Sequence, residues 1–164
     1  KLLVDIVSKN GNLLLSIPLR ADGTFDEKEE VILNDLGDWM AVNKEGIIDT
    51  RPWKVFGEGP IAESSVPINA QGFNEGTYNK ATSKEIRFTQ TDKNLYAIVL
   101  AWPEEKQVMI KSLATGSEWY PEKINRIDLL GYGKVSFTRT DQGLVINMPD
   151  KQVNKIAPVF RIRK

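Results

Sequence analysis

The chain of 164 residues contains neither cysteine nor histidine. Without cysteine it has no disulfide framework, no thiolate nucleophile and no thiolate zinc site. Without histidine, Ser-His and Cys-His catalysis, an imidazole base and a histidine-bound metal are excluded. Any chemistry in this chain would depend on carboxylates, lysine, tyrosine or a carboxylate-bound metal, and we expect no cofactor.

An excess of one charge and a long apolar run are also absent. The 22 Lys and Arg residues balance 22 Asp and Glu residues, and no segment forms a basic stripe, which argues against a nucleic-acid partner. The longest apolar run, residues 95–102, is far shorter than the roughly 20 residues of a membrane helix. We therefore expect neither nucleic acid nor a membrane as a partner.

The charge is unevenly divided along the chain, which indicates two structural parts. Residues 1–50 carry 5 basic and 10 acidic side chains, whereas residues 51–164 carry 17 and 12. The length suits one domain, or one domain with a fragment of another. Because the chain begins at Lys1 without an initiator methionine, we expect it to be a segment of a longer protein.

The first part has the pattern of an α/β crossover. Residues 2–7 have apolar side chains at helical spacing, and Gly11 suits the left-handed position after a helix. Residues 12–17 form a nearly continuous apolar run, which is typical of a strand covered on both faces in a parallel sheet. Such a strand needs parallel neighbours that this chain cannot supply, so we expect residues 1–20 to expose apolar surface.

A second helix follows this run. Thr24 and Glu27 form a capping-box pattern, and an amphipathic segment continues to Gly46. We expect one face of this helix to dock against the second part of the chain through Leu36, Trp39 and Met40.

The second part changes to the pattern of short strands. Seven segments are rich in β-branched and aromatic residues and are separated by turn residues: 85–89, 95–102, 107–113, 124–130, 134–140, 144–148 and 158–162. This spacing predicts an antiparallel β-sandwich or small barrel. Residues 57–80 show no clear period and are expected to form a functional loop, an arm or a linker.

Two motifs with a chemical appearance are better explained as turns. Residues 131–134, with the sequence GYGK, lack the spacing of a phosphate loop and precede a strand, so a hairpin turn is favoured. Asp22 follows the predicted buried strand, where barrel active sites form, but Asp-Gly is ordinary turn chemistry.

Aromatic residues offer a second kind of site, because a flat ring can stack on the apolar face of a sugar. Trp119 and Tyr120 are the best candidates, since they lie between predicted strands. Trp53 and Trp102 are further candidates, with Trp102 expected in the core. Because aromatic residues usually belong to the core of a small sandwich, the structural interpretation is favoured for all of them.

Several runs resemble the end of the catalytic barrel in α-L-fucosidases of glycoside hydrolase family 29. Residues 3–18 read LVDIVSKNGNLLLSIP, where the family pattern is LVDxVSKxGNLLLN, and residues 21–24 supply the following DGT. The family motifs LGxW, VNGEAIY and GTxxW resemble residues 36–39, 42–48 and 50–53. This sequence has Ser16 in place of the usual Asn, Lys44 in place of Gly, and residues 48–49 as Ile-Asp in place of Tyr-Gly. Residues 85–89 resemble the first strands of the family's C-terminal sandwich.

The resemblance implies a fold that is mainly β, in which an antiparallel β-sandwich follows a helix–strand–helix remnant of a (β/α)8-like barrel. The implied division is residues 1–50 as the barrel piece, 51–83 as a long loop or linker, and 84–164 as the C-terminal sandwich.

The resemblance also implies a functional role. Family members are retaining glycosidases that cleave terminal α-L-fucosides with an aspartate nucleophile and a carboxylate acid/base. These residues lie upstream of Lys1 in the family, so no catalytic residue is assigned here and the chain alone is expected to be inactive.

The expected partners are the catalytic barrel and a fucosylated glycan, in a secreted or periplasmic enzyme. Two alternatives remain open: a carbohydrate-binding sandwich that uses Trp119 and Tyr120, and a loop over residues 57–80 that shapes the rim of the active site.

Overall fold

The computed structural model describes residues 1–64 and 81–163. Its helices are α1 (Leu2–Ser8), α2 (Glu27–Asn43) and the single 3-10 turns η1 (Lys44–Gly46) and η2 (Lys111–Leu113). Its strands are β1 (Arg51–Glu58), β2 (Ile86–Gln90), β3 (Asn94–Val99), β4 (Gln107–Ile110), β5 (Arg126–Leu129), β6 (Gly133–Lys134), β7 (Phe137–Arg139), β8 (Leu144–Asn147) and β9 (Val159–Arg163). Among the residues described, no helix is long and apolar enough to cross a membrane.

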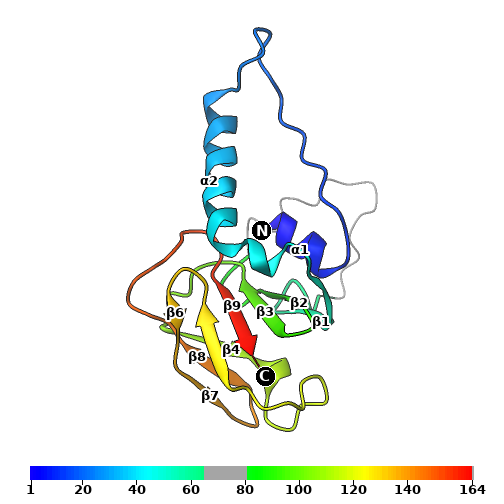
Figure 1. Ribbon diagram of the computed structural model, residues 1–164, viewed down its shortest axis with the longest axis vertical. Helices are drawn as coiled ribbons and strands as arrows, with labels where there is room; N and C mark the ends of the chain where they lie inside the picture. The colour runs from blue at the N-terminus through cyan, green and yellow to red at the C-terminus, as the bar shows by residue number, and fades with distance from the viewer. Residues whose placement is uncertain (65–80, 164) are drawn as a thin grey trace.

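The strands form two antiparallel sheets (Figure 1). The larger sheet has the order β1-β2-β3-β9-β5-β6, and the smaller has the order β4-β8-β7. The predicted antiparallel sandwich is therefore confirmed. Both helices lie on the side of the larger sheet that faces away from β4, β8 and β7 (Figure 1).

Strand β3 shows why residues 95–102 are almost continuously apolar. Leu95, Ala97 and Val99 contribute to the core between the two sheets. Tyr96 and Ile98 point to the opposite face and join a second cluster with residues of α1 and α2. Because successive side chains of a strand alternate between faces, burial of both faces requires apolar residues at every position.

Helix α2 docks on this second cluster at its C-terminal end. The Trp39 side chain is 5% exposed, and its indole Nε1 donates a hydrogen bond of 2.8 Å to the carbonyl of Ala157. The predicted docking of this helix is confirmed at Trp39, while Leu36 and Met40 are half-buried. The indole satisfies its one donor and buries its rings in the same contact.

The predicted strand over residues 12–17 is not formed. This segment is extended, it has no sheet partner among the described residues, and Leu14 is 94% exposed. A strand buried on both faces needs parallel neighbours, whereas all the strands of the two described sheets pair antiparallel and none of them pairs with this segment. The expectation of exposed apolar surface over residues 1–20 is met here.

The caps of both helices differ from the predicted pattern. Asp26, not Thr24, caps α2, and its carboxylate accepts a hydrogen bond of 2.9 Å from the Lys28 amide. After α1 the left-handed residue is Asn10, with φ 64°. Gly11 has a different role, because a Cβ there would lie 2.8 Å from Cγ2 of Ile6.

The long loop expected over residues 51–83 begins with a strand. β1 (Arg51–Glu58) pairs antiparallel with β2 and forms an edge of the larger sheet. Its register shifts between Pro52 and Gly57, and this irregularity hides the alternating pattern by which a strand is recognised. Residues 65–80 of the expected loop lie outside the described residues.

Two predicted strands are divided in the structure, and one predicted turn is confirmed. Residues 107–113 form β4 followed by η2, and residues 134–140 contribute to β6 and then β7. The GYGK motif covers the turn after β5 and the two residues of β6, with φ 79° at Gly131 and 111° at Gly133. These dihedral angles explain the two glycines without a phosphate ligand.

A buried ion-pair cluster joins α1 to the larger sheet. The Arg87 side chain is fully buried, and its Nε lies 2.6 Å from the carboxylate of Asp5. Its Nη1 lies 3.2 Å from the carboxylate of Glu85, which is also buried. Lys9 adds a second cation 2.9 Å from Asp5. A guanidinium on the sheet thus holds the first helix by a charged bond from which water is excluded.

A second ion-pair cluster occupies the part of the same sheet face near β5 and β9. The buried carboxylate of Asp128 lies 2.7 Å from Arg126, 3.2 Å from Arg161 and 3.3 Å from Arg163. Burial opposes ionisation of Asp128, but its bonds to Arg126 and Arg161 outweigh this effect and hold its pKa below the ordinary value.

Replacing Arg87 is expected to detach α1 from the sheet. Arg87→Met leaves Asp5 and Glu85 without this cation in a buried site, so we expect the free energy of unfolding to fall by about 3–5 kcal/mol. Urea denaturation measures this change. The matched control is Lys106→Met, which removes the exposed pair between Lys106 and Asp150. Similar unfolding midpoints for the two variants would contradict the proposed role of Arg87.

Replacing Asp128 is expected to give a destabilisation that depends on pH. Asp128→Asn removes charge-assisted bonds to arginines, so we expect a loss of about 2 kcal/mol at pH 7. Since the pKa of Asp128 is lowered on folding, this contribution is complete above the ordinary aspartate pKa of about 3.9 and is lost as the pH falls through the lower folded value. Parallel thermal unfolding of both proteins between pH 7 and pH 2 tests this; a pH-independent difference would contradict it.

Candidate functional site

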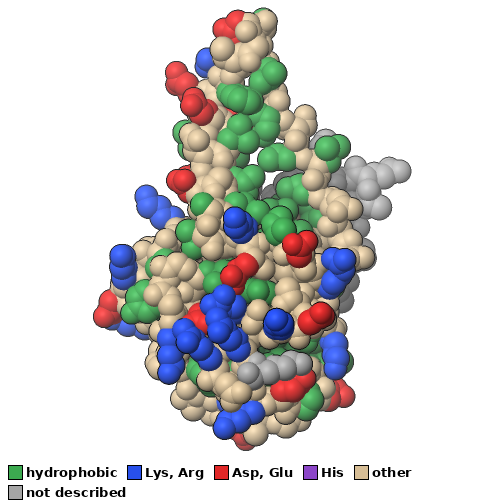
Figure 2. Space-filling model, in the orientation of Figure 1, with side chains coloured by type: hydrophobic (Ala, Val, Ile, Leu, Met, Phe, Trp, Pro, Cys, Tyr) green, Lys and Arg blue, Asp and Glu red, His purple; other side chains and the backbone are tan. Residues whose placement is uncertain are grey.

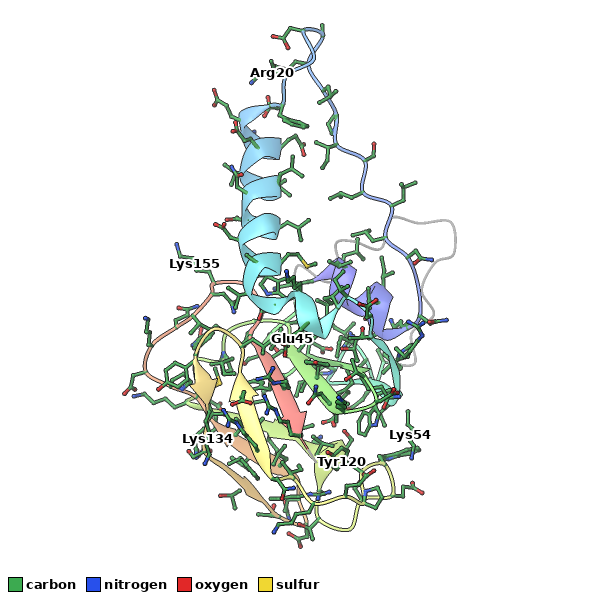
Figure 3. The ribbon with its side chains drawn as sticks, viewed as in Figure 1. Arg20, Glu45, Lys54, Tyr120, Lys134 and Lys155 are labelled. Carbon is green, nitrogen blue, oxygen red and sulfur yellow. The ribbon has the colours of Figure 1, made fainter. Side chains whose placement is uncertain are left out.

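A groove beside Trp119 is the strongest candidate site. It is a cavity of about 530 Å³ at the end of the larger sheet where β1 begins and β2 turns into β3. We call it the Trp119 groove; its lining residues are Asp49, Arg51, Trp53, Lys54, Gln90, Thr91, Asp92, Asn94, Leu95, Trp119, Tyr120 and Glu122. Lys54 and Tyr120 mark its position in Figure 3.

Strand pairing brings the polar wall of the groove together. Arg51, at the start of β1, pairs with Gln90 at the end of β2. The next residues form the tight turn into β3, closed by a hydrogen bond of 2.9 Å from the Thr91 amide to the Asn94 carbonyl. Residues distant in the sequence therefore converge at one end of the sheet.

Trp119 and Tyr120 do not form a joint aromatic platform. Trp119 is 43% exposed, whereas Tyr120 is 3% exposed and belongs to the core between the sheets. The Tyr120 ring packs edge-on against Trp53 at 6.4 Å, and Trp53 packs in the same way against Phe88 at 5.0 Å. Tyr120 therefore supports the floor of the groove, and only Trp119 presents an accessible ring.

Arg139 on β7 holds the segment that carries Trp119. Its guanidinium donates hydrogen bonds to four backbone carbonyls, those of Leu113, Ala114, Tyr120 and Glu122, at 2.5–3.1 Å. Its Cζ also lies 5.6 Å from the centre of the Tyr120 ring. Four charge-assisted bonds to one segment position Trp119 although it lies in no helix or strand.

The titration of Tyr120 agrees with its buried position. Burial, with a smaller contribution from the negative charge of Glu122, raises the pKa of Tyr120, while Arg139 opposes the shift. The hydroxyl is buried and has no hydrogen-bond partner within residues 1–64 and 81–163. Tyr120 therefore supplies a neutral ring and no acid or base near pH 7.

The polar side chains of the groove keep free hydrogen-bonding capacity. Asp92 and Lys54 make no hydrogen bond or ion pair within the described part of the chain, and both are exposed. Gln90 uses its amide nitrogen to bond the Pro52 carbonyl at 3.1 Å, which leaves its amide oxygen available. The groove thus combines free donors, free acceptors and one flat aromatic ring.

The other residues considered from the sequence occupy structural positions. The Asp22 carboxylate accepts bonds from the amide and the hydroxyl of Thr24, at 3.0 and 2.7 Å, and both bonds lower the pKa of this exposed group. This geometry is an Asx turn, as expected for Asp-Gly. Trp102 packs partly buried against the core. Within the described residues no group of three or more Asp and Glu side chains is placed to hold a metal ion.

The structure also gives a role to a buried carboxylate, Glu58, that the sequence analysis did not identify. Glu58, at the end of β1, accepts hydrogen bonds from the amides of Lys111 and Ser112 at 2.8 and 2.7 Å and from the Ser112 hydroxyl. These bonds fasten η2 to β1, so Glu58 is a structural residue. Its role was not predictable, because it depends on a contact across more than 50 positions of the chain.

Models of known protein families match both the N-terminal part and the C-terminal part of the chain. The model of the alpha-L-fucosidase C-terminal domain matches residues 78–163, which are more than half of the chain. The alpha-L-fucosidase model matches residues 1–45.

Individual relatives show the same relation. Tissue alpha-L-fucosidase of Macaca fascicularis is 31% identical over 158 residues, which are 96% of this chain and 28% of that protein. Plasma alpha-L-fucosidase of Homo sapiens is 26% identical over 95% of this chain and 28% of that protein. The chain thus spans about 28% of the length of these curated relatives.

A solved structure shares the fold. The crystal structure of Thermotoga maritima alpha-fucosidase in complex with a mechanism-based inhibitor matches 98% of this chain and 32% of that chain, with a TM-score of 0.70 and 24% identity. With two family models on the two parts of the sequence and this fold, the chain belongs to the alpha-L-fucosidase family and carries its C-terminal domain.

Proposed function

We propose that this chain is the non-catalytic C-terminal part of an enzyme that hydrolyses terminal α-L-fucosides with retention, and that it braces the catalytic barrel. The family relation supports the activity, and the aspartate nucleophile and carboxylate acid/base lie on a part of the enzyme upstream of Lys1. A retaining glycosidase needs two carboxyl groups about 5 Å apart on either side of the glycosidic bond. The buried carboxylates described above, Asp5, Glu58, Glu85 and Asp128, instead pair with arginines or fasten backbone amides.

The exposed apolar surface of the N-terminal part carries the bracing role. The extended segment 11–26 runs away from the sandwich and returns as α2, and hydrophobic side chains gather between the two (Figure 2). Their exposed fractions are high for apolar residues: Leu14 94%, Leu15 46%, Leu19 57%, Phe25 44%, Val31 59% and Ile32 51%.

An apolar surface of this extent calls for a partner with parallel strands and apolar helices. The rest of a (β/α)8-like barrel has that chemistry, since its strands are buried on both faces. In this arrangement the sandwich holds α1 and α2 from one side while the barrel covers their other side.

A free-standing carbohydrate-binding module is not favoured as the function of the chain. The alpha-L-fucosidase model covers residues 1–45, and those residues expose an apolar surface that an independent module would not need. The hypothesis that residues 57–80 shape the rim of the active site concerns mostly residues 65–80, which the structure does not describe.

The activity is tested on an aryl α-L-fucoside with two preparations, the full-length protein and this chain alone. We expect the full-length protein to release the aryl group with retention at the anomeric carbon, because only it carries both catalytic carboxylates. We expect no release by the chain alone. Turnover by the purified chain, or none by the full-length protein, would contradict the proposed function.

The bracing role is tested by placing a charge on the apolar surface. We expect Leu14→Asp to destabilise the full-length protein by at least about 3 kcal/mol, because it buries an unpaired carboxylate and removes a leucine from the barrel. Thermal unfolding and fucoside hydrolysis both report the loss.

The matched control is Met109→Asp on β4, where the methionine is 52% exposed and lies outside the apolar surface. This variant is expected to keep the unfolding temperature and the activity of the unmodified protein. If Leu14→Asp behaved like Met109→Asp, Leu14 would be exposed in the full-length protein and the bracing role would be wrong.

A further inference from the structure

The exposed tryptophan on the sandwich lies in a setting that the proposed function does not use. Three aromatic side chains are well exposed in the described residues: Phe25 at 44%, Trp119 at 43% and Tyr132 at 50%. Phe25 belongs to the apolar surface assigned to the barrel, and Tyr132 lies in the tight turn between β5 and β6. Trp119 is the one of the three that lines the groove.

The indole of Trp119 borders two adjacent hollows. One is the Trp119 groove of about 530 Å³, and the other, of about 620 Å³, is lined by the opposite part of the same segment, including Ser112, Ser117 and Glu118. A flat ring between two hollows offers contact to more than one unit of a chain-like ligand. An isolated small molecule would use only one of them.

The polar groups around the ring suit a ligand rich in hydroxyl groups. Within residues 1–64 and 81–163, Lys54 provides an unpaired cationic donor and Asp92 provides unpaired acceptor oxygens. The amide oxygen of Gln90 adds a neutral acceptor, because within the described residues only the amide nitrogen of this side chain is bonded. A sugar hydroxyl both donates and accepts, so each of these groups can pair with one.

The charge of the groove favours a neutral ligand. Its lining includes three acidic residues, Asp49, Asp92 and Glu122, and two basic residues, Arg51 and Lys54. An anionic ligand would meet three carboxylates, and a cationic ligand would meet two basic groups. A neutral ligand avoids both repulsions.

The rigidity of the site supports the same interpretation. Arg139 fixes the segment on both sides of Trp119 through four backbone carbonyls, and the buried Tyr120 and Trp53 rings form a packed floor. A ring that is already held in place loses little conformational freedom when a ligand stacks on it, which favours binding.

From the exposed ring, the free polar groups and the charge balance, we propose that the Trp119 groove binds a neutral oligosaccharide, with a sugar ring stacked on Trp119 and hydroxyl groups bonded to Lys54 and Asp92. Trp119, Lys54 and Asp92 all lie on the sandwich sheets or the segments that connect their strands, and of the lining residues Asp49 precedes β1. The site does not depend on the hydrolytic activity proposed above.

The test uses the full-length protein and three neutral oligosaccharides without fucose: N-acetyllactosamine, cellotetraose and xylotetraose. Isothermal titration calorimetry and saturation-transfer NMR measure binding. We expect at least one of them to bind saturably, and Trp119→Ala to weaken its affinity at least tenfold. Trp119→Phe, which keeps a flat ring, is expected to weaken it less than the alanine variant.

Two further variants make the test specific. Lys54→Ala removes an exposed donor without disturbing the core, and we expect it to weaken binding several-fold even if Trp119→Ala alters the segment. Tyr132→Ala removes an equally exposed aromatic ring outside the groove and is expected to leave both the affinity and fucoside hydrolysis unchanged. The thermal unfolding temperature of each variant confirms that it is folded.

Three outcomes would overturn the proposal: no saturable binding of any neutral oligosaccharide, equal binding by Trp119→Ala and the unmodified protein, or preferential binding of sialyllactose as a charged comparison. Binding that depends on Trp119 in a protein without fucosidase activity would support this site and contradict only the proposed function. Fucosidase activity in a protein that shows no such binding would support the proposed function and contradict this site.

Discussion

Burial of both faces of the larger sheet is the constraint on which the rest of this structure depends. The inward side chains of β2, β3 and β9 pack against the smaller sheet, as Phe88, Ala97 and Phe160 do. The outward side chains would face water if α1 and α2 did not cover them. The sandwich therefore stabilises the N-terminal segment, and the N-terminal segment completes the sandwich.

The polar residues on the outward face show how this contact is made specific. Arg87 reaches α1 through the carboxylate of Asp5, and the Thr89 hydroxyl donates a hydrogen bond of 2.6 Å to the carbonyl of Gly46 after α2. Apolar burial alone would permit many helix positions, whereas a buried guanidinium needs its carboxylate at one place. Charge and hydrogen bonding thus set where the helices lie, while apolar packing supplies most of the stabilisation.

The same arrangement links the proposed function to the fold. The sandwich holds α1 and the C-terminal end of α2, whereas apolar side chains of the rest of α2 and of the segment before it remain exposed. Apolar side chains on two sides of this segment favour packing against a second domain as well as against the sandwich. The division of the chain into a barrel piece and a sandwich is thus a proposal in which residues 1–50 connect the two bodies.

Much of the sandwich could be predicted from the sequence, because the alternating and continuous apolar patterns depend on neighbouring residues. The strand at residues 51–58 was missed because an irregular register hides the alternation. The predicted strand at residues 12–17 was wrong for this chain. The apolar run is typical of a strand that is covered on both faces, and no described element of this chain pairs with it or covers it on both faces. The left-handed backbone of Asp49, with φ 58°, lies where the family usually has glycine, which explains that preference after the fact.

What the sequence determined by itself was the class of fold and the exclusion of cysteine and histidine chemistry, since these follow from local pattern and composition. The family followed from the resemblance of its motifs to those of known proteins. Only the tertiary structure decided which of two adjacent aromatic residues is exposed and which is buried. Trp119 faces solvent beside a groove and Tyr120 lies in the core, because Arg139, about twenty positions away, binds the backbone around them. This contact is not visible in the local sequence, so the residues next to Trp119 and Tyr120 could not predict that one ring is exposed and the other buried.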